Sequence, residues 1–124
     1  MILKADTFVH QGNYEEAEQM IKEVLEASKD EFEAWSILCD VYFEQSKWDK
    51  LLGASKNALE LSHEKRSKES IILYQIKALI ETGNLHSAEE RLDSLEGVKR
   101  RLVIKRATEL RDEIIDKRKQ VSNI

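Results

Sequence analysis

Proline is absent from this 124-residue chain, glycine occurs four times, and Cys39 is the only cysteine. Few residues can therefore interrupt a helix, and the composition favours a helix-rich protein. A single cysteine excludes a disulfide within the chain and gives no sign of an oxidising compartment. The chain has no run of eighteen apolar residues, and its polar beginning does not resemble a signal peptide. We expect a soluble, intracellular, cytoplasmic protein.

Side chains suited to catalysis are sparse and scattered. The three histidines, His10, His63 and His86, show no metal-ligand spacing with each other or with Cys39. The chain has no glycine-rich phosphate loop and no Ser/His/Asp arrangement. Cys39 could be read as a nucleophile, but its place among apolar residues is more typical of a buried, inert thiol. We expect no enzymatic activity, no metal and no cofactor.

The chain repeats itself at regular offsets. An offset of 34 aligns Gly12 with Ser46, and an offset of 71 aligns Gly12-Asn13 with Gly83-Asn84. Since 71 is 34 + 37, we expect a three-residue insertion around His63–Lys68. A period of 34 is typical of helix–turn–helix repeats. We expect Asp30 to cap the third of seven helices, with Glu33 in capping-box spacing. The predicted helices span about 1–10, 14–28, 31–45, 48–62, 67–82, 85–95 and 98–119.

The second unit carries the most specific pattern, Trp35-x2-Leu38-Cys39-x2-Tyr42, followed by Trp48 and Ala58-Leu59-Glu60-Leu61. It resembles the tetratricopeptide repeat family. The resemblance implies an all-α, right-handed α-solenoid of antiparallel helix pairs, with three units in 1–96 and a basic capping helix and tail in 97–124. In this register Met1 takes the place of the family's tryptophan, so the first unit is incomplete. We therefore expect a segment of a longer repeat protein, or one whose first repeat is degenerate.

In that family, partners usually lie in a concave groove lined by the first helix of each pair. The resemblance therefore implies a non-catalytic scaffold that binds a peptide or helix of a protein partner. Apolar groove residues with an acidic rim favour a partner with apolar anchors and basic flanks. The acidic rim disfavours a carboxylate-terminated peptide of the kind that cochaperone members bind. The implied groove residues are Ile37, Asp40, Phe43, Glu44, Leu73, Tyr74, Lys77, Ile80 and Glu81.

Four of these residues, Ile37, Phe43, Tyr74 and Ile80, should form an exposed apolar strip, because they face away from the Trp35–Tyr42 stripe. Two other interpretations stay open. Superhelical twist or the chain's own last helix could bury the strip. The chain could also be a self-associating, oligomeric structural domain of a larger protein or assembly.

Charge is distributed unevenly along the chain. Residues 1–98 hold 11 Lys+Arg and 20 Asp+Glu, a net charge of −9, whereas residues 99–124 hold 9 and 4, a net charge of +5. In the last helix an apolar stripe of Val103, Ala107, Leu110 and Ile114 predicts a cap on the preceding pair. Its charges could also meet an acidic partner, a second copy or, less favoured without aromatic residues, nucleic acid. This second candidate surface comprises Lys99, Arg100, Arg101, Lys105 and Arg106.

Overall fold

The computed structural model describes residues 2–122, apart from the side chains of residues 66, 121 and 122. These residues form seven α-helices and no strand, which confirms the predicted fold class. None of these helices combines the length and the apolar character needed to cross a membrane. The helices are α1 Ile2–His10, α2 Tyr14–Ala27, α3 Phe32–Glu44, α4 Trp48–Leu61, α5 Lys65–Glu81, α6 Leu85–Asp93 and α7 Arg101–Ser122.

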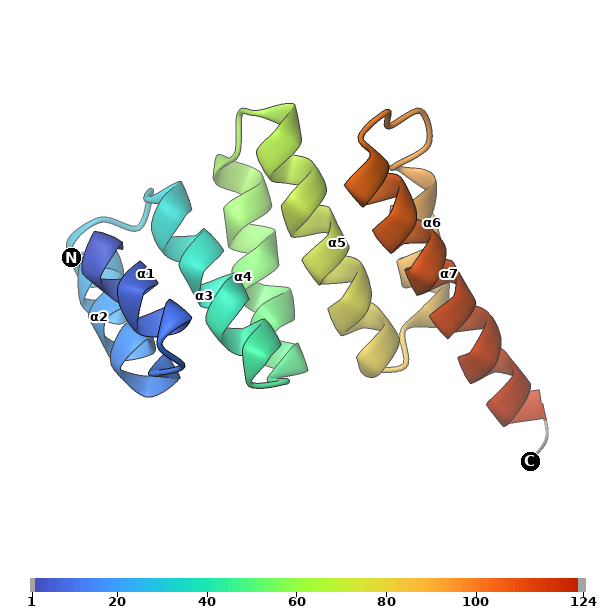
Figure 1. The fold of residues 1–124 in the computed structure, drawn as a ribbon, viewed down its shortest axis with the longest axis horizontal. Coiled ribbons are helices and arrows are strands. Elements are labelled where there is room, and N and C mark those ends of the chain that lie inside the picture. Colours follow the sequence, from blue (N-terminus) through green and yellow to red (C-terminus); the bar gives the residue numbers. More distant parts are fainter. Residues whose placement is uncertain (1, 123–124) are drawn as a thin grey trace.

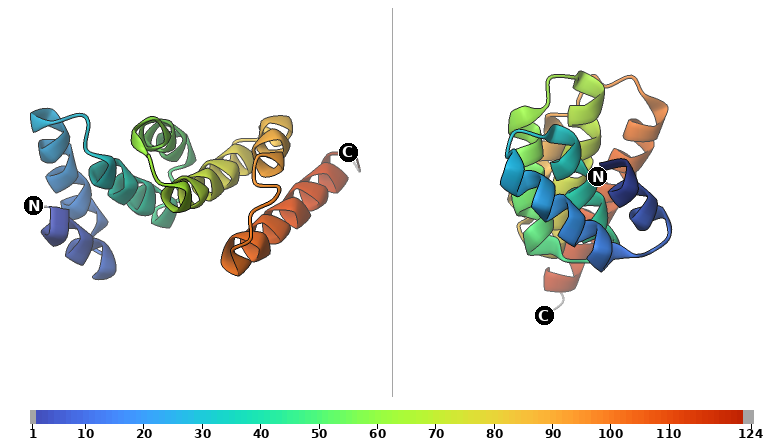
Figure 2. Two further views of the ribbon diagram at one scale, coloured as in Figure 1. Left: turned by 90° about the horizontal axis from the view of Figure 1, so that it is seen from above. Right: turned by 90° about the vertical axis from the view of Figure 1, so that its left-hand side faces the viewer.

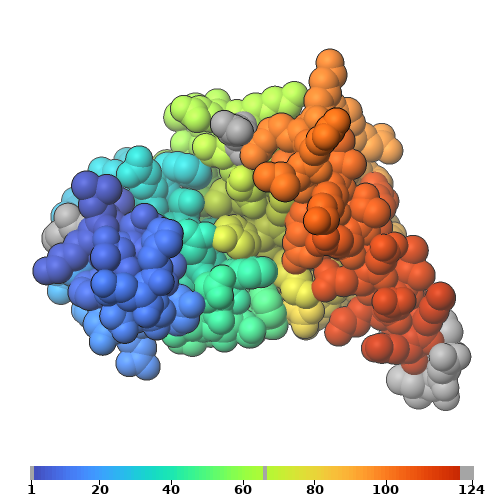
Figure 3. Space-filling model, in the orientation of Figure 1, coloured from blue at the N-terminus to red at the C-terminus, as the bar shows by residue number. Residues whose placement is uncertain are grey.

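Helices adjacent in sequence pack against each other in a solenoid-like row (Figure 1). Helices α1, α3, α5 and α7 lie on one side of the row, and α2, α4 and α6 lie behind them (Figure 2). The last helix, α7, packs against both α5 and α6. On the face shown in Figure 3, α3 and α5 therefore lie between α1 and α7.

The same turn joins the two helices of each pair. Its middle residue has a positive φ: 80° at Gly12, 56° at Ser46 and 83° at Gly83. The backbone N–H of the next residue donates to the carbonyl five residues earlier, the bond of a Schellman motif. These bonds are Asn13 to Phe8 at 2.8 Å, Lys47 to Tyr42 at 2.9 Å and Asn84 to Leu79 at 2.8 Å. The structure thus repeats with the offsets of 34 and 37 that the sequence shows.

The insertion before the third unit lengthens a helix rather than a loop. Helix α5 has 17 residues, whereas α3 has 13, and it begins at Lys65, two residues before the predicted start. The extra residues therefore add one helical turn at the start of α5.

The predicted cap of α3 and the predicted start of α7 were also wrong. The N-cap of α3 is Glu31, whose side chain makes no capping hydrogen bond, so Asp30 is not the cap. Helix α7 begins at Arg101 rather than 98, because Gly97, at φ 84°, turns the chain just before it. It continues to Ser122, past the predicted end at 119.

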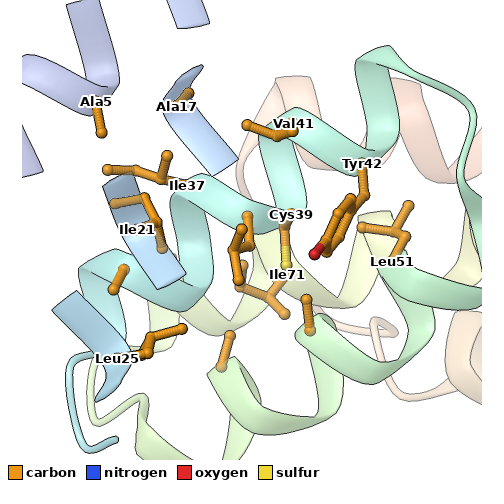
Figure 4. Close-up of a cluster of buried hydrophobic side chains, with 14 of the residues drawn as sticks. Ala5, Ala17, Ile21, Leu25, Ile37, Cys39, Val41, Tyr42, Leu51 and Ile71 are labelled. Atoms are coloured by element: carbon orange, nitrogen blue, oxygen red, sulfur yellow. The ribbon is translucent and has the colours of Figure 1, made fainter. Parts of the chain in front are cut away.

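Two hydrophobic clusters hold the row together. The first joins α1 to α4 with part of α5, and it includes the predicted stripe of Leu38, Cys39 and Tyr42. Figure 4 shows Cys39 and Tyr42 pointing toward Ile71 and Leu51. The second joins α5, α6 and α7. In α7 the predicted stripe is confirmed, with Val103, Leu110 and Ile114 buried and Ala107 partly buried.

Candidate binding groove

Two adjoining pockets lie on the side of α1, α3 and α5. The larger, of about 480 Å³, lies between α3 and α5, and the smaller, of about 250 Å³, lies between α1 and α3. Phe32, Ser36 and Asp40 of α3 line both pockets, so we call the combined hollow the groove. Arg106 of α7 borders its other end. The remaining residues of the larger pocket are Phe43, Ser67, Ser70, Ile71, Leu73 and Tyr74.

The aromatic rings of Phe43 and Tyr74 line one wall of the groove, and Trp48 packs against Phe43. The ring centroid of Phe43 lies 5.1 Å from that of Tyr74 and 6.0 Å from that of Trp48. All three rings are partly buried, and the Tyr74 hydroxyl donates a hydrogen bond to the carboxylate of Asp40. Because neighbouring rings and this hydrogen bond restrict their rotamers, Phe43 and Tyr74 present fixed apolar surface at low entropic cost.

The carboxylate of Asp40 lies where a negative charge is unfavourable. Burial raises the pKa of Asp40, and the charges of Asp6 and Glu44 raise it further. The hydrogen bond from Tyr74 and the nearby His10 lower it, but the net shift of the pKa is upward. Burial and the charge of Asp40 in turn raise the pKa of Tyr74. A cation placed in this part of the groove would offset the unfavourable charge.

Lys77, the one basic residue expected in the groove, connects α5 to α7. Its Nζ atom lies 2.9 Å from Glu81 Oε1 and 2.6 Å from Glu113 Oε1, and 5.8 Å from the centroid of the Trp48 ring. Burial lowers the pKa of Lys77, but these two carboxylates outweigh it and the net shift is upward. Lys77 and Glu81 are thus engaged in a bridge within the chain.

The prediction that four apolar residues form an exposed strip was wrong for two of them, which are buried. Ile37 is only 6% exposed and Ile80 only 1%. Figure 4 shows Ile37 beside Ala5 and Ala17, because α3 packs against the preceding pair as well as against α4. Ile80 belongs to the cluster of α5, α6 and α7. Of the expected groove residues, Asp40, Phe43, Leu73 and Tyr74 line the larger pocket, Ile37 lines the smaller one, and Glu44 is exposed nearby.

Several groove residues were missed from the sequence. Phe32 continues the face of Asp40 toward the start of α3, so extending the stripe by two turns would have found it. Ser67 lies in the first turns of α5, in the segment where the insertion falls. Arg106 was assigned to the other candidate surface, because its approach to α3 and α5 depends on how α7 docks.

The basic residues near the end of the chain do not form one uniform patch. Arg100 contacts the buried Glu69 at 3.1 Å, and Arg106 contacts Glu109 at 3.1 Å. Two further arginines of α7 contact α6, Arg111 at 3.3 Å from Asp93 and Arg118 at 2.7 Å from Glu89. Lys99, Arg101 and Lys105 are exposed. Much of the basic charge is therefore matched by carboxylates of the same chain.

Cys39 is fully buried, and burial raises the pKa of its thiol to about 12. No group of three or more His, Cys, Asp or Glu side chains within residues 2–122 is placed to hold a metal ion.

Comparison with known proteins identifies no family for this chain. No protein-family model matches the chain, and no curated protein is found to be similar to it. The groove is therefore interpreted from its own geometry and charge.

Proposed function

We propose that the chain is a non-catalytic interaction scaffold of the tetratricopeptide type, which binds a helix or extended peptide of a protein partner in the groove. One observation carries this proposal. The hollow across α1, α3 and α5 combines partly exposed aromatic rings with a carboxylate in an unfavourable electrostatic environment. Perturbed charges in a cleft are typical of functional sites.

The lining of the groove specifies the chemistry of the partner. Phe43, Tyr74 and Leu73 offer apolar contact for one or two large side chains in the pocket of about 480 Å³. Asp6, Asp40 and Glu44 favour a basic residue next to that anchor and repel a carboxylate. We therefore expect a peptide with an apolar anchor and a Lys or Arg flank.

The repeated turns and the packing of the Trp35–Tyr42 stripe support the tetratricopeptide assignment. Trp35 is partly buried, and its indole N–H donates to the carbonyl of Lys29 at 3.0 Å. Leu38, Cys39 and Tyr42 are buried, and Tyr42 donates to Glu18 of α2 at 2.8 Å. The second unit thus uses its signature residues to join its own pair and the preceding one.

Peptide selection tests the proposal. Peptides selected from a random displayed library on the wild-type chain should carry an aromatic or aliphatic residue beside Lys or Arg. Phe43→Ala/Tyr74→Ala should weaken the selected peptide by at least about tenfold in a fluorescence titration. Because truncation can also loosen the fold, Ser36→Arg provides a second variant that obstructs the groove without creating a cavity.

The matched control is Leu102→Ala, which removes an exposed apolar side chain from α7, outside the groove. It should leave the affinity unchanged. Equal affinity of the wild type and of a folded Ser36→Arg variant would overturn the proposal.

A further inference from the structure

The charges that line the groove are separated by sign. Three acidic residues, Asp6, Glu33 and Asp40, line the smaller pocket between α1 and α3. Asp40 also lines the larger pocket, which Arg106 of α7 borders on the far side. Among residues whose side chains the structure describes, Arg106 is the one basic residue that lines either pocket. The groove therefore has an acidic end beside α1 and a basic end beside α7.

Little of the charge at the acidic end is neutralised within the chain. His10 Nδ1 lies 3.8 Å from Asp6 Oδ2 and offsets that carboxylate only when protonated. Neither Glu33 nor Asp40 forms a salt bridge within the described part of the chain. Glu44 lies close enough to Asp40 to add to the repulsion. One or two basic side chains of a partner would relieve it.

At the basic end, Arg106 can bind a second carboxylate. Its Nη1 atom donates to Oε2 of Glu109 at 3.1 Å, which uses one of the five N–H donors of the guanidinium. The two side chains are 34% and 48% exposed, and an exposed pair three residues apart on one helix contributes little stability. Lys77 already bridges Glu81 and Glu113, so two carboxylates can share one cation in this chain. An acidic side chain of a partner can therefore bind Arg106 without displacing Glu109.

Other charged side chains near the groove do not reverse this order. Lys65 and Lys68 are exposed in the first turns of α5 and line neither pocket. Glu64, the N-cap of α5, lines a neighbouring pocket together with Ser67. Lys77 is engaged by its two carboxylates. The separation by sign therefore holds across the groove as a whole.

The distance between the two ends fits a short extended segment. Helices α1, α3, α5 and α7 follow one another along this side, and each packs on the next of the four (Figure 1). Packed helices have axes about 8–10 Å apart, so the acidic pocket and the end of the Arg106 side chain are roughly 10–20 Å apart. An extended chain covers that distance in about three to six residues. Phe43 and Tyr74 line the larger pocket, between those two ends.

We propose that the groove selects an extended segment whose charges are ordered. Lys or Arg lies over the acidic end, a large apolar side chain packs on Phe43 and Tyr74, and Asp or Glu binds Arg106. This selectivity rests on the proposed function and extends it, because Arg106, supplied by the last helix, becomes a specificity-determining residue. These contacts fix the order of the charges and not the direction of the backbone, so either chain direction satisfies them.

Parallel peptide selection tests this order of charges. A random displayed library is selected on the wild-type chain and on Arg106→Glu. On the wild type, an Asp or Glu should be enriched about three to six residues from the Lys or Arg, on the other side of the apolar anchor. On Arg106→Glu that position should carry Lys or Arg instead, while the basic preference at the acidic end stays unchanged.

Titration of one peptide measures the size of the effect. The peptide selected on the wild type is made with an amidated C-terminus, so that no terminal carboxylate competes for Arg106. Replacing its Asp or Glu by Asn or Gln should weaken binding to the wild type about three- to tenfold, and replacing it by Lys should restore binding to Arg106→Glu. Arg101→Glu is the matched control, since it changes the charge of α7 equally at an exposed residue that lines neither pocket. It should bind like the wild type, and both variants should keep the wild-type helicity.

Two kinds of failure are distinguishable. Identical residues at the expected acidic position of peptides selected on both chains would overturn the role of Arg106, although the groove would still bind an apolar anchor with a basic flank. An equal loss of affinity in Arg101→Glu would overturn it too, because net charge alone would then explain the effect. Selection without an enriched apolar and basic pair would instead overturn the proposed function, and the order of charges with it.

Discussion

At Asp40 the requirements of stability and of the proposed function conflict most clearly. Its carboxylate is partly buried beside two other acids, and the hydrogen bond from Tyr74 compensates only in part. A residue selected for stability alone would not keep a charge there. The negative charge is explained if a cationic group of a partner binds it.

Asp40→Asn should stabilise the free chain while weakening the binding of a basic peptide. The folded state raises the pKa of Asp40 above its unfolded value, so the folded protein binds a proton more tightly than the unfolded one. The ionised carboxylate therefore costs stability at neutral pH, and that cost disappears as the pH falls through the raised pKa and below the unfolded value. We expect a gain of about 0.5–1 kcal/mol at pH 7 in urea unfolding, fading toward pH 3.

Asp30→Asn is the control for this experiment, because Asp30 lies in an exposed turn. Its stability should change little at either pH. A loss of stability in Asp40→Asn at pH 7 would show that the hydrogen bond from Tyr74 outweighs the unfavourable charge.

Ser46 lies at a turn position whose backbone conformation favours glycine. It occupies the turn position of Gly12 and Gly83 but has a side chain at φ 56°. Glycine adopts this conformation without steric strain. Ser46→Gly should therefore raise the free energy of unfolding by about 0.5–1 kcal/mol, measured by urea denaturation. Gly83→Ser should lower it by a similar amount, and a destabilised Ser46→Gly variant would contradict this account.

At the scale of helices, the sequence predicted what depends on local patterns. The repeat offsets placed the starts of α2, α4 and α6 correctly, because a large apolar residue follows each turn at Tyr14, Trp48 and Leu85. The start of α5 was missed, because the inserted residues can extend a helix or a loop equally well. The start of α7 depends on the turn at Gly97, which no repeat offset marked.

The groove was predictable only in part, because it depends on packing between units. A helical wheel of α3 separates the face of Trp35 and Tyr42 from the rest, but it does not show that α1 and α2 cover Ile37. Likewise, Lys77 looks like a free groove cation until the docking of α7 brings Glu113 within 2.6 Å. Side chains between neighbouring pairs therefore have to be assigned from the assembled structure.

At the scale of the molecule, α7 is attached by both charge and apolar contact. Arg100, Arg111 and Arg118 contact carboxylates of α5 and α6, so part of the charge difference between the two ends of the chain is neutralised internally. The pairs of Arg111 and Arg118 are exposed, and exposed pairs contribute little to stability and weaken with salt. We therefore expect the buried apolar stripe of α7, which belongs to the second cluster, to supply most of the free energy that holds α7 against α5 and α6.

The division into two clusters predicts that the molecule is not uniformly stable. In a row of repeats each unit contacts only its neighbours, so a change at one end is felt mainly there. Leu110→Ala removes a fully buried side chain of the second cluster and should cost about 2–4 kcal/mol. Amide hydrogen exchange should then lose protection in α6, α7 and the second half of α5, while α2, α3 and the first half of α4 keep theirs. Leu102→Ala, in an exposed part of α7, should change neither region, and an equal loss of protection along the whole chain would show that the two clusters unfold as one.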